Sequence, residues 1–176
     1  MISKSQETKT QQFHFPTDTQ LTPAGTNYNI VEVAGGTSQQ QRVGNQIKLT
    51  SFRLKGILSL DHGFTGNLWD IVRVVLYIPK DPDDTLNLGV SEAIDLDQFT
   101  ILSDRLIPMG SNHDACKLYN KVLLFKKGRR TGMNVQFSSD LATAVTKNNI
   151  KMYMVCKSAA NTPKFNGYWR FYFKDS

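Results

Sequence analysis

Positively charged side chains are the most concentrated chemical feature of this sequence. Residues 117–130 contain six lysines and arginines and no acidic residue, whereas residues 27–116 contain eleven acidic residues and seven basic ones. The densest part is the block Lys126, Lys127, Arg129 and Arg130. Such a block binds polyanions by neutralising their charge and releasing their counterions. It is equally typical of a solvated hairpin tip, so it predicts a basic surface and leaves the partner open.

A second basic set lies within residues 41–60, which read QRVGNQIKLTSFRLKGILSL. Its members are Lys48, Arg53 and Lys55, and they alternate with apolar residues. Period-2 alternation predicts a half-buried strand with one apolar and one cationic face. Lys48, Arg53 and Lys55 are therefore an alternative nucleic-acid or polyanion site. Solubility, or surface ion pairs of small net stability, would explain them as well.

Asp81, Asp83 and Asp84 form the acidic cluster that offers the oxygen ligands preferred by calcium. Three carboxylates within four residues converge on one ion only with help from elsewhere, such as a neighbouring subunit. The alternative is a plain turn, because Asp and Pro are favoured turn residues. Calcium is the one cofactor that the sequence suggests.

No group of residues suggests catalysis. His14, His62 and His113 are scattered, and none has a second metal ligand at a typical spacing. Because no nucleophile, base and orienting group can be named together, we expect no enzymatic activity. Cys116 and Cys156 are too few and too far apart for a disulfide framework or a zinc site, and we expect both to be reduced.

These side chains must be positioned by β-strands. In residues 41–60 the apolar alternation shifts by one position at Thr50 and Ser51, which predicts a β-bulge or a break between two strands. Strand patterns occur in eight segments: 28–33, 41–60, 68–78, 99–109, 116–127, 133–137, 149–157 and 168–174. We expect 116–127 and 133–137 to pair as a hairpin around 128–132. Eight antiparallel strands without a convincing helix predict an all-β fold, a two-sheet jelly roll.

The length of 176 residues suits a single domain. Residues 1–26 are rich in Thr, Gln, Ser and Pro, which predicts an extended N-terminal arm ahead of a jelly-roll domain at 27–176. No apolar run approaches the ~20 residues that span a bilayer, and the first residues lack a signal-peptide core, so we expect no membrane insertion.

Two segments of the chain resemble capsid proteins of small viruses with circular single-stranded DNA that encode a replication initiator. They also resemble the coat protein of satellite tobacco necrosis virus, which shares that architecture. Residues 41–56 follow an Arg-x-Gly-Asn/Asp-x-Ile/Val pattern through Arg42, Gly44, Asn45 and Ile47. Residues 99–106 follow an aromatic-x-Ile/Val-Leu-x-Asp pattern through Phe99, Ile101, Leu102 and Asp104.

The resemblance implies a jelly roll that self-assembles into a T=1 icosahedral shell around a single-stranded genome, in a virion. DNA and RNA genomes both fit. It implies structural roles for Arg42, Gly44, Asn45, Phe99, Leu102 and Asp104. In that family the end of the fold carrying residues 126–130 points outward, so this block fits an anionic host-surface partner as well as a genome.

One departure from the family concerns the N-terminus. Family members usually begin with a long arginine- and lysine-rich arm, whereas residues 1–26 carry only Lys4 and Lys9, balanced by Glu7 and Asp18. Two other functions remain open. A monomeric sandwich that binds carbohydrate or protein through its loops fits the same fold. A nucleic-acid chaperone could stack bases on aromatic residues, although alternation assigns Trp169 and Phe171 to the core.

Overall fold

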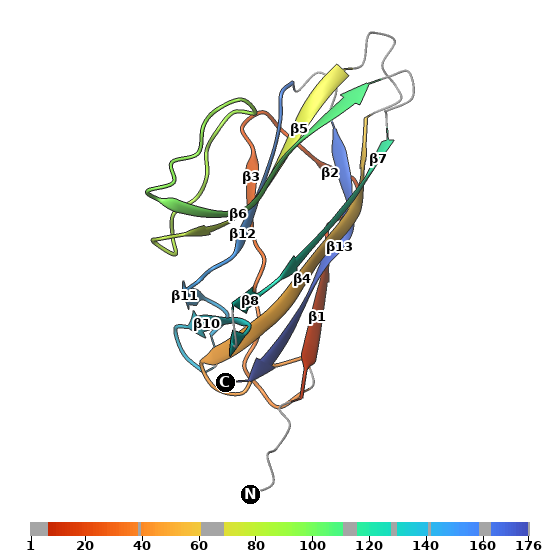
Figure 1. The fold of residues 1–176 in the computed structure, drawn as a ribbon. Coiled ribbons are helices and arrows are strands. Elements are labelled where there is room, and N and C mark those ends of the chain that lie inside the picture. Colours follow the sequence, from red (N-terminus) through yellow and green to blue (C-terminus); the bar gives the residue numbers. More distant parts are fainter. Residues whose placement is uncertain are drawn as a thin grey trace, which may run out of the picture.

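The computed structural model describes residues 7–38, 40–60, 69–110, 116–127, 130–140, 142–158 and 163–175; for 126–127 and 130–131 it describes the backbone only (Figure 1). These residues form thirteen β-strands and no helix. No helix among them is therefore long and apolar enough to cross a membrane.

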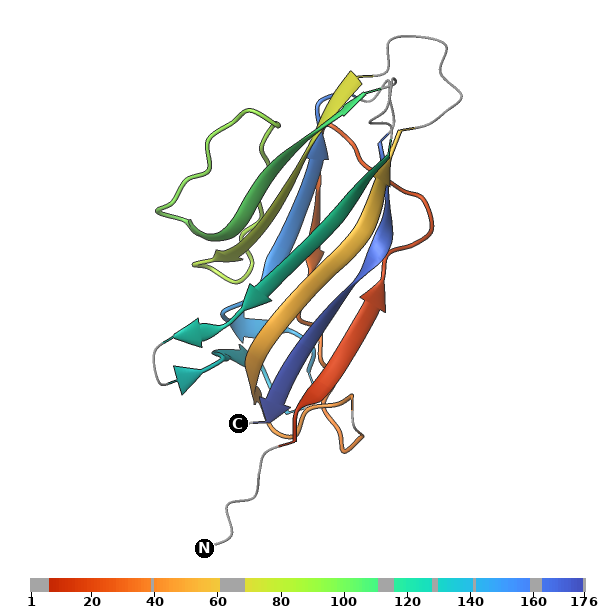
Figure 2. The same ribbon diagram turned by 45° about the vertical axis from the view of Figure 1, so that its right-hand side comes forward.

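A seven-stranded antiparallel sheet forms one layer. Its long strands run in the order β1 (Lys9–His14), β13 (Lys164–Asp175), β4 (Gln46–Ser59) and β7 (Cys116–Leu124) (Figure 2). The short strands are β2 (Thr19–Gln20) beside β13, β10 (Met133–Phe137) beside β4, and β11 (Val145–Lys147) beside β10.

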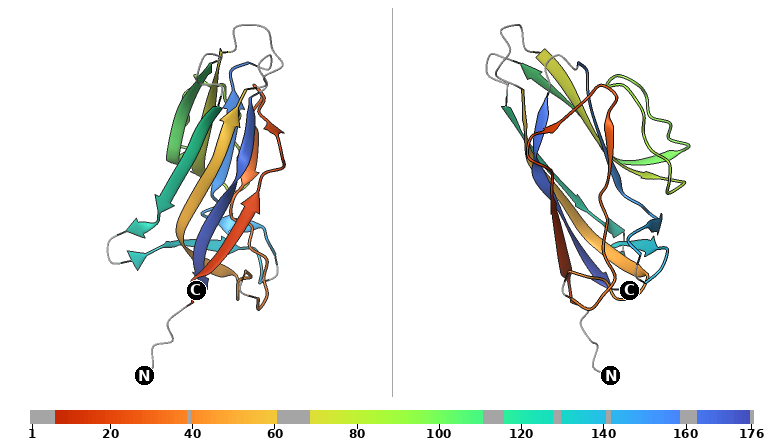
Figure 3. Two further views of the ribbon diagram at one scale, coloured as in Figure 1. Left: turned by 90° about the vertical axis from the view of Figure 1, so that its right-hand side faces the viewer. Right: turned by 180° about the vertical axis from the view of Figure 1, so that it is seen from behind.

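The second layer is a four-stranded antiparallel sheet. Its order is β3 (Thr26–Asn29), β12 (Lys151–Cys156), β5 (Trp69–Pro79) and β6 (Phe99–Gly110). A separate two-stranded hairpin contains β8 (Lys126–Lys127) and β9 (Arg130–Thr131). The two layers face each other across the core (Figure 3).

The strand orders identify the topology. The eight principal strands, in chain order, are β1, β3, β4, β5, β6, β7, β12 and β13. The first, eighth, third and sixth of these form one sheet, and the second, seventh, fourth and fifth form the other. This interleaving, in which successive strands alternate between the sheets except for the β5–β6 pair, is a jelly roll. The predicted all-β, antiparallel jelly-roll fold is confirmed, although the structure divides the chain into more strands than the eight expected.

The long strand β4 changes its buried face at the predicted place. Ile47 and Leu49 are buried before the change, and Phe52 and Leu54 are buried after it. In the pairing with β13, Ser51 lies opposite Tyr172 and Leu49 lies opposite Phe173, so Thr50 is the extra residue of a β-bulge. The Thr50 hydroxyl donates a 2.9 Å hydrogen bond to the Tyr172 carbonyl. Of the two predicted possibilities, a bulge or a break between strands, the structure shows the bulge.

The structure differs from the predicted boundary at residue 26 between an N-terminal arm and the jelly-roll domain, because residues 9–20 belong to the seven-stranded sheet. Lys9–His14 pair residue by residue with β13, and Phe15 and Leu21 are buried in the main core. This segment is extended, as expected, but it is the edge of the sheet rather than an arm ahead of the domain. The sequence did not predict this strand because its residues are largely polar. An edge strand needs an apolar residue only where it touches the core.

The predicted hairpin between 116–127 and 133–137 is wrong. Strands β7 and β10 both pair with β4, against Ser51–Ser59 and Gln46–Leu49 respectively, so they lie end to end along one edge. Between them the chain leaves the sheet as the small β8–β9 hairpin. The Phe125 amide donates to the Thr50 carbonyl at 3.0 Å, which places this excursion beside the bulge. A single 14-residue β4 is long enough to pair with both.

Arg42 ties three loops together at one end of the sandwich. Its side chain is fully buried, and Nε donates to the Val33 carbonyl at 3.1 Å. Nη1 donates to the Gly44 carbonyl, and Nη2 donates to the carbonyls of Ser139, at 2.7 Å, and Ala142. The guanidinium also lies 4.0 Å from the centre of the Phe137 ring. Burial lowers the pKa of Arg42, and nearby Asp140 opposes that shift.

The neighbouring motif residues act through the backbone. Gly44 has φ of +82°, a left-handed conformation that glycine adopts without strain. The Asn45 carbonyl accepts a 2.8 Å hydrogen bond from the Phe137 amide at the end of β10. The first motif therefore starts β4 and fastens the loops around it.

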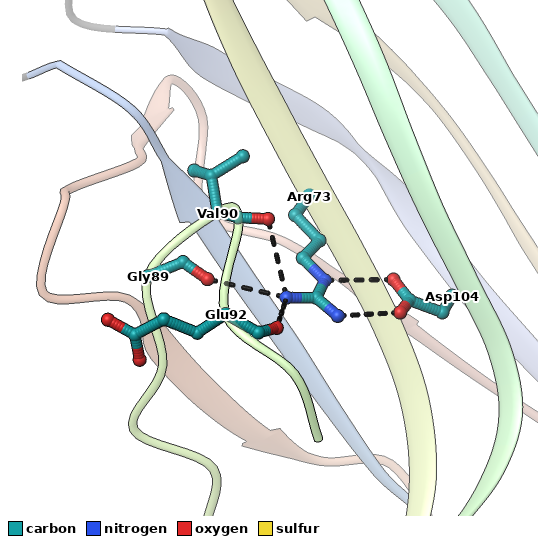
Figure 4. A network of polar contacts seen from close by, with 5 residues as sticks. All are labelled: Arg73, Gly89, Val90, Glu92 and Asp104. Carbon is teal, nitrogen blue, oxygen red and sulfur yellow. Dashed lines mark hydrogen bonds and ion pairs between the residues drawn. The ribbon is translucent and has the colours of Figure 1, made fainter.

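Asp104 of the second motif holds a buried arginine of the adjacent strand (Figure 4). Arg73 donates from Nε to Oδ1 of Asp104 at 3.0 Å and from Nη2 to Oδ2 at 2.7 Å. Its Nη1 donates to the carbonyls of Gly89, Val90 and Glu92 in the connection between β5 and β6, the shortest at 2.6 Å to Glu92. The hydrogen bond to Asp104 is the main reason that the pKa of Arg73 is raised.

This clamp holds the β5–β6 connection over the outer face of the four-stranded sheet. A second apolar cluster lies beneath it, and Phe99 packs there edge-on against Tyr77, with ring centres 5.4 Å apart. Burial raises the pKa of Tyr77 to about 12. Leu102 instead packs against the main core. The geometry gives Phe99, Leu102 and Asp104 packing and clamping contacts.

Candidate nucleic-acid interface

The outer face of the seven-stranded sheet gathers cations from two strands that are distant in sequence. On β4, Lys48, Arg53 and Lys55 occupy the positions opposite to the buried ones. On β13 the buried residues alternate with outward-facing, partly exposed ones. We call the following residues the basic face: Lys48, Arg53 and Lys55 of β4, with Tyr168, Arg170, Tyr172 and Lys174 of β13.

Strand pairing sets these cations directly against one another. Arg53 is the register partner of Arg170, and Lys48 is the register partner of Lys174. Side chains that are directly opposite have Cβ atoms about 4.5–5.5 Å apart, and like charges there destabilise a sheet. Both pairs are cation against cation, so the sheet holds a concentration of positive charge that its own folding does not favour.

No carboxylate on the strands compensates for this charge. The outward positions of β1, β4, β7 and β13 carry no Asp or Glu. The ion pairs recorded within the described ranges are Lys9 with Asp175 and Arg73 with Asp104, neither of which involves the basic face. Asp18 lies at the border of the face, where its Oδ1 accepts a 2.9 Å hydrogen bond from Asn166.

Flat aromatic groups lie among the cations. Tyr168 lies opposite Lys55, and the Arg170 guanidinium carbon is 5.8 Å from the centre of the Tyr168 ring. On the other side of Tyr168, the His14 ring is centred 5.8 Å away. Arg170 Nε donates to the neutral Gln12 Oε1 at 2.8 Å, which orients the guanidinium without neutralising it. Cations beside exposed aromatic rings are the elements that bind single-stranded nucleic acid.

The sequence predicted part of this face and missed part of it. Lys48, Arg53 and Lys55 do share one outward face. Arg170 and Lys174 were not predicted as partners, because alternation shows which way a side chain points but not which strand lies beside it. Trp169 and Phe171, the aromatic residues assigned to the core, are buried.

The described residues of the basic block, Lys126, Lys127 and Arg130, lie on the β8–β9 hairpin, which leaves the sheet beside the bulge at Thr50. The backbone pairs Lys126 with Thr131 and Lys127 with Arg130. Arg129 lies outside the described residues, and the side chains of the other three are not described. The hairpin projects from the edge of the seven-stranded sheet rather than from an end of the sandwich (Figure 2). The block remains a predicted polyanion site.

The acidic cluster forms a turn in the structure. The Asp83 amide donates to Asp81 Oδ1 at 3.1 Å, and the Asp84 amide donates to the Asp81 carbonyl at 3.1 Å. Within the described part of the chain, no three acidic, histidine or cysteine side chains come together as a metal site. A cation is already present, because the Lys151 ammonium donates to the Asp84 carbonyl at 2.9 Å. The calcium hypothesis therefore gains no geometric support.

A polar cavity of about 310 Å³ adjoins this turn, and its lining includes Glu32, Asp83, Asn149 and Lys151. Asn149 and Lys151 are only 7% and 5% exposed. Burial lowers the pKa of Lys151, while the three aspartates of the turn oppose that shift. Asn149 Oδ1 has no hydrogen-bond partner among the described residues. The cavity brings one cation and two carboxylates together.

Comparisons with known proteins give only remote similarities. No family model and no curated protein sequence matches the chain. Among solved structures, a chain of Desmodium yellow mottle tymovirus is 11% identical, with a TM-score of 0.47, covering 97% of this chain and 86% of that one. A chain of T=1 particles derived from infectious bursal virus is 14% identical, with a TM-score of 0.18, covering 95% of this chain and 40% of that one. At these values neither structure assigns a family.

Proposed function

We propose that this protein is a viral capsid subunit that assembles into a small icosahedral shell and contacts a single-stranded nucleic-acid genome through the basic face. The observation that carries the proposal is the pairing of Arg53 with Arg170 and of Lys48 with Lys174 on strands whose described outward positions carry no carboxylate. Bound phosphates would relieve the repulsion between these cations and release counterions.

The fold and the sequence motifs support the same role. Arg42 and Asp104, the charged residues of the two capsid-like segments, make the buried contacts that fasten loops to the jelly roll. The role proposed for these two residues is structural, because Arg42 holds loop carbonyls directly and Asp104 holds Arg73, which does the same. Residues 1–26 carry only two cations, Lys4 and Lys9. Genome contact through the sheet face would not depend on this segment.

The alternative function is a monomeric sandwich module that binds a carbohydrate or a protein. The polar cavity beside Lys151 is the feature that favours it. Light scattering of the purified protein separates the two. The shell predicts particles of tens of subunits with co-purified nucleic acid, seen as a raised ratio of absorbance at about 260 to 280 nm. A nucleic-acid-free species near 19.9 kDa, the mass of one chain, would support the alternative.

A further inference from the structure

Strand β7 is an open sheet edge that carries a row of exposed apolar side chains. It pairs with β4 on one side, and no strand of the described chain pairs with its other side (Figure 2). Leu118 and Leu124 are 80% and 64% exposed, and Val122 lies between them on the same side. Ile57, the β4 partner of Leu118, is exposed beside it. We call these four residues the edge stripe.

A groove next to the edge stripe, lined by both apolar and basic residues, reaches to the other sheet. A cavity of about 360 Å³ lies between β6 and β7, and its lining includes Leu106, Pro108 and Leu118. Leu106 is 58% exposed. Strand β7 contains no proline or acidic residue. Although it carries Lys117 and Lys121, its exposed apolar side chains leave an open edge that can pair with another strand.

We propose that a second copy of this chain docks here, with β7 pairing antiparallel to β7 of the partner about a two-fold axis at Asn120. This inference rests on the proposed function and names one of its contacts. In this register residue 116 faces 124, residue 118 faces 122, and residue 120 faces itself, so all nine residues of β7 are paired. Leu118 then meets Val122 of the partner subunit, which extends both edge stripes into one apolar surface.

Charge selects this register over its neighbours. Strand β7 carries Lys117 and Lys121. A shift of two residues one way sets Lys117 opposite Lys121 of the partner subunit. A shift the other way sets Lys121 opposite itself, and like charges directly opposite are destabilising. A shift by one residue turns the edge stripe to the wrong face. The register centred on Asn120 is thus self-complementary, as a two-fold contact requires, and an icosahedral shell contains two-fold axes.

A disulfide tests this arrangement. Directly opposite residues in an antiparallel pair have Cα atoms about 4.5–5.5 Å apart, within the roughly 4.4–6.8 Å that a disulfide spans. The test uses a Cys116→Ser background, because Cys116 is an exposed free thiol whereas Cys156 is buried. Asn120→Cys should give, on mild oxidation, a covalent dimer of twice the 19.9 kDa chain mass on a non-reducing gel.

Two controls define the outcome. Leu96→Cys is the matched control, since Leu96 is 69% exposed and lies in the β5–β6 connection, away from β7. It should remain unlinked, and adding Leu118→Lys to Asn120→Cys should abolish the dimer. Cross-linking of Asn120→Cys no greater than that of Leu96→Cys, in protein with an unchanged melting temperature, would overturn the proposed contact. Failure of the unmodified chain to form particles would instead count against the proposed function.

Discussion

Arg53 of β4 and Arg170 of β13 lie directly opposite one another on the outside of the seven-stranded sheet, and Arg170 donates a hydrogen bond to the neutral Gln12 side chain. The arrangement repeats in Lys48 and Lys174. A sheet selected only for stability would place an acid at one position of each pair. We interpret the pairs as a surface adapted to an external polyanion.

Removal of charge from the basic face should weaken binding to single-stranded nucleic acid. For Arg53→Gln, Lys55→Gln and Arg170→Gln combined, we expect the slope of log affinity against log salt concentration to become shallower by about 2, since each contact with a single strand contributes about 0.7. Fluorescence anisotropy with a labelled oligonucleotide measures the slope. The matched control is Lys80→Gln, an exposed lysine after β5. Equal slopes for the triple variant and the unmodified chain would exclude the basic face.

The hairpin block provides a separate test. Replacement of Lys126, Lys127, Arg129 and Arg130 by glutamine should lower the salt-dependent affinity for a polyanion. Heparin and single-stranded DNA distinguish the two partners considered. A loss confined to heparin indicates an anionic host-surface partner, whereas a loss with DNA indicates the genome. An unchanged salt slope with both ligands would remove the block as a binding site.

Arg42 should be essential for stability. Arg42→Met keeps the apolar stem but leaves four backbone carbonyls, that of Val33 buried and the others partly buried, without their donor. We therefore expect about 2 kcal/mol of lost unfolding free energy. Urea denaturation measures this loss. Asn45→Ala is the comparison, because the described hydrogen bond of Asn45 uses its backbone carbonyl, and we expect a smaller loss. Equal stability of Arg42→Met and the unmodified protein would contradict the role of Arg42 in holding the loops together.

Asp104 should matter through Arg73. Asp104→Ala leaves a buried guanidinium without its carboxylate, which typically costs about 3–5 kcal/mol, and less here because Asp104 itself is 34% exposed. The β5–β6 connection should then become more accessible to protease. Limited proteolysis reads out the connection, and denaturation reads out the whole fold. A protected connection in Asp104→Ala would show that Arg73 holds it without the carboxylate.

The two cysteines should differ in reactivity. Cys116 is exposed, whereas Cys156 is buried, and burial raises the pKa of the Cys156 thiol to about 11. Because the thiolate is the reactive form, a thiol reagent at about pH 8 should modify one cysteine in the native monomer and both in denaturant. Mass spectrometry locates the modification. Rapid labelling of Cys156 in native protein would contradict its burial.

Alternation of side chains was enough to predict the sandwich, the bulge at Thr50 and the outward direction of Lys48, Arg53 and Lys55. It could not reveal that β13 lies beside β4, because strands more than a hundred residues apart are joined only by tertiary packing. Arg170 was therefore not predicted as part of the site. Strand β1 was missed because its residues are largely polar and it pairs along one edge only. The prediction of a hairpin between β7 and β10 was wrong because both strands pair with β4 instead of with each other.

The most direct measurement is a cryo-electron microscopy map of the assembled particles, which reports assembly and subunit orientation together. We predict a closed shell in which the face bearing Arg53 and Arg170 points towards the lumen and touches density for nucleic acid. Particles with this face turned to the exterior, or protein that stays a single chain at high concentration, would contradict the account.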